Sequence, residues 1–112
     1  MGQLSEITID AEDPQRLAHF WAAALDGYMT DHSGVRLKSD AGPAINFQRV
    51  PEAKSVKARV HLDIVTKDVE GDIFRLKRMG AKIVGEKEED GRTWTVMQDV
   101  EGNEFCVIHG AD

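Results

Sequence analysis

Polar and apolar residues alternate along the start of the chain, which is typical of a half-buried strand. Over residues 4–10 one face carries Ile7 and Ile9, and the other carries Glu6, Thr8 and Asp10. The spacing therefore predicts a strand with one face toward a core and one polar face.

The next segment predicts a helix with one apolar face. Asp13 is a favoured N-cap residue and Pro14 suits the first turn. Apolar side chains then recur at helical spacing: Leu17, Phe20, Trp21, Ala24 and Leu25. Gly27 is expected to end the helix as a left-handed cap, and three strands are predicted after it, over 28–32, 35–39 and 44–49.

The same plan repeats after a predicted linker over 51–57. A strand over 59–66 is expected to turn Val60, Leu62 and Ile64 toward a helix and His61, Asp63 and Val65 away from it. Asp68 and Gly80 bound a second helix, with Ile73 and Leu76 inward; Gly71 in its first turn is expected to shorten or fray it. Three more strands are predicted over 82–87, 93–98 and 104–109.

The repeated order indicates one α+β domain over residues 1–112, built from two paired β-α-β-β-β modules. Module one covers about 3–50 and module two about 58–110. We expect the modules to form a curved mixed sheet with helices on its convex side and a cleft on its concave side. Two β-α-β stretches can share a period by accident, but the matching helix caps favour a true repeat.

The strand alternation predicts which residues face the cleft. They are Glu6, Thr8 and Asp10; Ala44, Asn46 and Gln48; His61, Asp63 and Val65; and Glu104, Cys106 and Ile108. The repeat places Glu6 opposite His61, and Asn46 opposite Cys106. Trp94, between two threonines, can lie on either face of its strand, and in a cleft it would suit a flat organic ligand.

Composition narrows the function classes. A net charge of −6, with scattered basic residues, argues against nucleic acid as a partner. The single cysteine excludes an internal disulfide and a multi-cysteine zinc site. The apolar stretches are too short to span a membrane, and the start of the chain lacks a signal-peptide pattern. These features predict a cytoplasmic protein.

Three segments resemble the vicinal oxygen chelate superfamily, above all its small glyoxalase-like domains. They are residues 13–21 (Asp-Pro-Gln-Arg-Leu-Ala-His-Phe-Trp), 59–63 (Arg-Val-His-Leu-Asp) and 99–105 (Asp-Val-Glu-Gly-Asn-Glu-Phe). The resemblance implies the paired-module fold, a small-molecule ligand and a homodimer. Relatives include drug-sequestering proteins related to bleomycin resistance.

Catalytic members of the superfamily hold a divalent metal with His or Glu on the first strand of each module and Glu on each last strand. Carried over, those places are Glu6, Asn46 or Gln48, His61 and Cys106. Glu6 and His61 suit a metal, whereas the amides and the thiol replace carboxylates. The resemblance thus implies an incomplete metal site and no required cofactor, while leaving a divalent metal open.

Two functions follow, and a regulatory or accessory domain is a third possibility. The first is binding of a small organic molecule by Thr8, Asn46, Gln48, Asp63, Trp94 and Cys106 without a complete metal site. The second is a lyase, isomerase or dioxygenase with Glu6 and His61 as catalytic residues. His61 beside Asp63 could be an oriented base or a structural histidine bonded to Asp63 or Arg59, and Cys106 a buried filler or a nucleophile.

Overall fold

The computed structural model describes residues 3–53, 55–56 and 60–110. The chain divides into two compact units, Met1–Ala53 and Lys54–Asp112, here called module one and module two. The division falls inside the predicted linker. Lys54 and Lys57 of that linker, and Arg59 at the predicted start of the next strand, lie outside the described residues.

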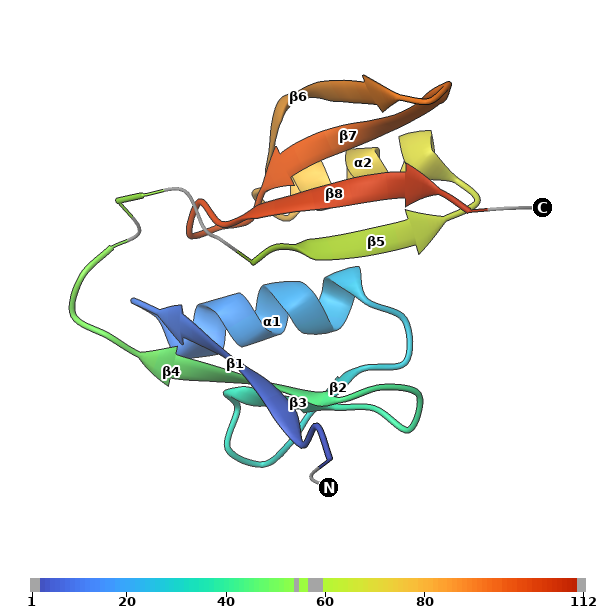
Figure 1. Cartoon of the computed structure of the whole chain (residues 1–112). Helices are drawn as coiled ribbons and strands as arrows, with labels where there is room; N and C mark the ends of the chain where they lie inside the picture. Colours follow the sequence, from blue (N-terminus) through green and yellow to red (C-terminus); the bar gives the residue numbers. More distant parts are fainter. Residues whose placement is uncertain (1–2, 54, 57–59, 111–112) are drawn as a thin grey trace. The chain divides into compact units, whose positions relative to one another are not determined.

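Module one is a four-stranded mixed sheet with one helix against it (Figure 1). Its elements are β1 (Glu6–Ala11), α1 (Pro14–Ala24), β2 (Met29–Thr30), β3 (Arg36–Lys38) and β4 (Ala44–Arg49). The strand order is β1-β4-β3-β2, with β1 parallel to β4 and the other pairs antiparallel.

Module two repeats this plan. Its elements are β5 (Leu62–Thr66), α2 (Val69–Arg78), β6 (Lys82–Glu89), β7 (Arg92–Gln98) and β8 (Glu104–His109). The order β5-β8-β7-β6 matches that of module one, and again only the first pair is parallel. The α+β fold and the β-α-β-β-β repeat are therefore confirmed, as two four-stranded sheets.

Each module has its own core beneath its last strand. Ile45 and Phe47 of β4 are 4% and 2% exposed, and Phe105 and Val107 of β8 are both 0% exposed. As predicted from the helix stripe, Phe20 and Trp21 are buried too, and their rings meet edge to face with centroids 5.4 Å apart. Alternate residues of β4 and β8 thus point into the cores.

The predicted helix starts are confirmed, and one of the two predicted ends is wrong. The carboxylates of Asp13 and Asp68 accept hydrogen bonds from backbone N–H groups three residues later, at 3.3 and 3.0 Å. Gly80, at φ +107°, follows α2 as a left-handed cap. Gly27 also has positive φ, but α1 already ends at Ala24 because Leu25 is extended.

Gly71 does not shorten α2, which runs for ten residues against eleven in α1. Its N–H is the donor to Asp68, and a Cβ at this position would lie 2.7 Å from the carboxyl carbon of Asp68. Glycine therefore leaves room for the capping carboxylate, and the cap offsets its low helix propensity.

Other differences concern strand ends. β5 begins at Leu62, and Val60, expected to face a helix, is 75% exposed ahead of the strand. β6 extends to Glu89 because Asp90 and Gly91, with φ of +52° and +76°, form a tight turn whose twist matches the flanking strands.

No helix in the described part of the chain is long and apolar enough to cross a membrane.

Candidate functional site

A pocket of about 480 Å³ lies on module two, within the usual size range of small-molecule sites. It is lined by His61, Asp63, Lys87, Glu89, Asp90, Arg92, Trp94, Val96, Glu104, Cys106 and Ile108. The lining residues come from all four strands of the module, from the turn between β6 and β7, and from the residue that precedes β5.

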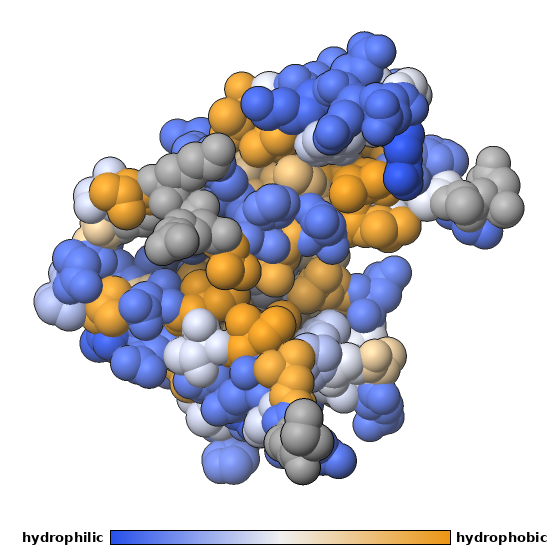
Figure 2. All heavy atoms as spheres, viewed as in Figure 1, coloured by the Kyte–Doolittle hydropathy of each residue, from blue (hydrophilic) through white to orange (hydrophobic). Residues whose placement is uncertain are grey.

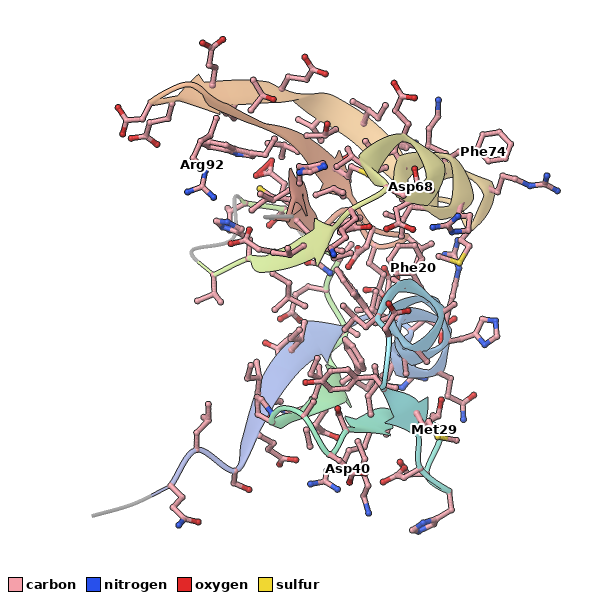
Figure 3. All side chains as sticks on the ribbon, turned by 90° about the vertical axis from the view of Figure 1, so that its right-hand side faces the viewer. Phe20, Met29, Asp40, Asp68, Phe74 and Arg92 are labelled. Atoms are coloured by element: carbon pink, nitrogen blue, oxygen red, sulfur yellow. The ribbon has the colours of Figure 1, made fainter. Side chains whose placement is uncertain are left out.

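Strand alternation puts the pocket on the sheet face opposite α2. Phe105 and Val107 of β8 are fully buried, so the alternate residues Cys106 and Ile108 point to the other face. Figure 3 shows Arg92 projecting from the β6–β7 hairpin on the side away from α2. The three residues of β8 that were predicted to face away from the helix therefore line the same pocket: Glu104, Cys106 and Ile108.

The pairing register of β7 and β8 places apolar side chains next to one another, and these form the floor of the pocket. Ile108 lies opposite Trp94 and Cys106 lies opposite Val96 in the antiparallel pair of β7 and β8. Trp94 is half-buried and faces the pocket, which settles the face that its sequence context left open. In Figure 2 hydrophilic side chains gather over the β6–β7 hairpin and hydrophobic side chains over the neighbouring part of β8.

A His-Asp-Cys cluster occupies one part of this pocket. Nε2 of His61 lies 3.3 Å from Oδ1 of Asp63, and Asp63 lies opposite Cys106 in the parallel pair of β5 and β8. One ligand atom from each of the three residues lies within 4.8 Å of the others. Both His61 and Asp63 are exposed, whereas Cys106 is only 7% exposed.

The environment of Cys106 favours the protonated thiol. Burial raises its pKa, and the negative charge of Asp63 and a hydrogen bond to that carboxylate raise it further. Glu104 adds to the rise, and Lys87 opposes it more weakly. A protonated thiol is a poor nucleophile, so the buried-filler interpretation of Cys106 is the better supported one.

The remaining predicted site residues lie in module one. Thr8 of β1 pairs with Asn46 of β4, and Gln48 lies two residues further along β4. Nε of Arg36 lies 2.8 Å from Oε2 of Glu6, so this glutamate already has a cationic partner. The pairing of Glu6 with His61 remains a prediction.

The lining residues that sequence reasoning did not select as site residues lie mostly on the hairpin. Glu89 and Asp90 of the acidic stretch 86–90 line the pocket, together with Lys87 and Arg92. The alternation of 92–96 could have found Arg92 and Val96, because residues two apart share a face with Trp94. Without the β6–β7 register, the facing residues of β6 could not be named.

We asked whether the His-Asp-Cys cluster suits the divalent metal that the resemblance implies. Around a tetrahedral zinc ion, ligand atoms lie about 3.3–3.8 Å apart, close to the 3.3 Å between His61 and Asp63. Imidazole, carboxylate and thiolate are all zinc ligands, whereas magnesium prefers oxygen ligands alone. The donor types therefore suit a zinc-type ion better than magnesium, provided that the ion displaces the thiol proton. The three ligand atoms lie within 4.8 Å of one another, so closing around the ion would draw them together.

Comparison with known proteins gives a family model that spans most of the chain. A model described as a glyoxalase-like domain matches residues 6–108. A search of curated proteins found no match to the chain.

Several solved structures have the same fold as this chain. A glyoxalase/bleomycin resistance protein/dioxygenase family enzyme from Burkholderia phytofirmans is 19% identical, with 96% of this chain and 98% of that chain covered and a TM-score of 0.75. A fosfomycin resistance protein from Listeria monocytogenes, complexed with Mn(II) and a dihydroxypropylphosphonic acid, is 15% identical, with 99% and 92% covered and a TM-score of 0.75. A bleomycin-binding protein complexed with bleomycin is 15% identical, with 99% and 100% covered and a TM-score of 0.64.

Proposed function

Because the chain belongs to the glyoxalase-like domain family, we propose that it binds a small organic molecule in the pocket of module two. The observation that carries this proposal is the pocket face of Trp94, which lies beside Ile108 and Val96. An exposed aromatic surface over an apolar floor gains free energy when a flat ligand covers it. Bleomycin bound to a protein of the same fold supports this class of function.

The proposal requires no metal. The module-one residues that the resemblance assigns to a metal are Glu6, which is paired with Arg36, and the neutral amides Asn46 and Gln48. Neutral amides are weak ligands compared with carboxylates, so binding rests on the apolar floor and the polar groups around it.

A titration with quinoline, a neutral flat bicycle, tests the proposal. Fragments of this size bind with dissociation constants of about 1 mM. We expect quinoline to shift the backbone amide NMR signals of Trp94, Cys106 and Ile108. Trp94→Ala should weaken binding at least about tenfold. Phe74→Ala is the matched control, since Phe74 is an aromatic residue, 61% exposed, on the helix of the same module (Figure 3).

A second candidate is an enzyme of the lyase, isomerase or dioxygenase type with a divalent metal, and the His-Asp-Cys cluster favours it. His61, Asp63 and Cys106 would hold the ion, which when bound acts as a Lewis acid on a substrate oxygen. Glu6 would act as the acid or base at the substrate. In this case Glu6→Gln abolishes turnover but leaves ligand binding nearly intact.

Metal analysis separates the two candidates. Protein purified without chelators should contain no stoichiometric metal if binding alone is the function. One equivalent of divalent ion that is lost in His61→Ala, but kept in the control His109→Ala, would establish the second candidate instead. His109 is an exposed histidine at the end of β8 and does not line the pocket.

We further propose that the two modules form one domain and that the protein is a cytoplasmic homodimer. The free Cys106 is consistent with a reducing compartment, and the superfamily resemblance supports pairing of modules across a dimer. Sedimentation equilibrium should give twice the chain mass of 12.4 kDa, and a monomer mass would contradict the dimer.

A further inference from the structure

The charges around the module-two pocket are unequal in sign. Four carboxylates line it, from Asp63, Glu89, Asp90 and Glu104, against two basic side chains, Lys87 and Arg92. An opening with an excess of negative charge attracts cations and repels anions.

Register pairing shows where the excess lies. Arg92 is directly opposite Glu89 on β6 and β7, and opposite charges in such a pair compensate each other locally. Lys87 is directly opposite Trp94. Asp63 lies opposite Cys106 on β5, and Glu104 lies two residues before Cys106 on β8. Neither carboxylate has a lysine or arginine opposite it in the ladder, although His61 lies 3.3 Å from Asp63. The negative excess is therefore at the end of the pocket next to Cys106.

From this geometry we infer that the ligand is a flat aromatic molecule carrying a positive charge, with its ring on Trp94 and its cationic end at Asp63 and Glu104. The inference rests on the proposed binding function and adds the charge of the ligand. An aromatic face also attracts a cation directly, so Trp94 and the two carboxylates act in the same sense.

Three probes of similar size and different charge test the inference: N-methylquinolinium, quinoline and 2-naphthoate. Titrations are followed by NMR at about pH 8. We expect the cation to bind at least about fivefold more tightly than quinoline, and the anion more weakly than either. Added salt should reduce the preference, because the carboxylate of Asp63 is exposed to solvent.

Variants locate the charge effect. Glu104→Gln and Asp63→Asn should each lower the affinity for the cation about two- to fivefold, and by more than they lower the affinity for quinoline. Glu70→Gln is the control, because Glu70 is an exposed glutamate in the first turn of α2 and does not line the pocket.

The outcomes distinguish the two levels of the proposal. If quinoline and the cation bind equally, or the anion binds best, the inference about charge is overturned while the binding function stands. If none of the three probes shifts the pocket signals, the binding function itself fails. If the preference for the cation survives in both carboxylate variants, Asp63 and Glu104 are not its cause and the inference is overturned.

Discussion

Asp63 and Cys106 lie directly opposite each other on the parallel strands β5 and β8, and the carboxylate of Asp63 adds to the rise in the pKa of the thiol that burial begins. Asp63 is exposed and Cys106 is buried, and both line the pocket. Burial first, and then this carboxylate, raise the pKa of the Cys106 thiol and so favour its protonated form over the nucleophilic thiolate.

The first prediction concerns the reactivity of Cys106. Because its pKa is raised, less thiolate is present at a given pH than for an ordinary thiol with a pKa of about 8.5. Alkylation by iodoacetamide, followed by mass spectrometry, should therefore be slow at neutral pH, with the midpoint of its rate profile above that value.

The variant Asp63→Asn tests the cause of this shift. Removing the carboxylate charge should lower the midpoint, but not to the ordinary value, because burial is the larger cause and is unchanged. Glu70→Gln should leave the profile as in the wild type. A midpoint that is unchanged or raised in Asp63→Asn would show that the carboxylate does not control the thiol.

The second prediction compares two phenylalanines of module two. Phe105→Ala removes a side chain that is 0% exposed, so the free energy of unfolding should fall by about 3–5 kcal/mol. Phe74, on α2, is 61% exposed, and Phe74→Ala should change it by no more than about 0.5 kcal/mol. Urea denaturation measures both. Similar losses in the two variants would mean that α2 is covered in solution.

The third prediction concerns Gly71 and the cap of α2. Gly71→Ala should destabilise the protein by about 0.5–2 kcal/mol, because the new methyl group would displace the Asp68 carboxylate from the cap. In the background of Asp68→Ala the carboxylate is absent, and the same change should instead stabilise the helix by about 1 kcal/mol. A stabilising effect in both backgrounds would contradict the steric argument.

The sequence predicted those features that depend on local pattern. The periods of two and of 3.6 residues located the helices and most strands, and the capping residues Asp13 and Asp68 marked both helix starts. Features that depend on which strands pair, and in which register, could not be predicted from the local pattern. The face of Trp94 follows from its register with Ile108, and the two basic residues on the hairpin reach the pocket only through the register of β6 and β7.

The same limit applies within the candidate site. His61, Asp63, Trp94 and Cys106 were selected from the chain, and all four line one pocket. Asp63 was not among the metal positions that the resemblance supplied, and only its placement opposite Cys106 makes it a third donor beside His61. Alternation assigns a residue to a face, but its neighbours on that face are set by tertiary pairing.

The last prediction concerns the ion pair between Glu6 and Arg36. Its atoms are 2.8 Å apart, but the side chains are 35% and 32% exposed, and pairs this open contribute about 0.2–1 kcal/mol. Glu6→Gln and Arg36→Gln should therefore each lower the free energy of unfolding by less than about 1 kcal/mol. A double-mutant cycle by urea denaturation should give a coupling energy in the same range, and salt should reduce it further. A coupling energy above about 2 kcal/mol would identify Glu6 as a structural residue and remove it as the candidate acid or base of the second proposed function. A small coupling energy means that Glu6 can give up its contact with Arg36 and contact a substrate or a metal instead.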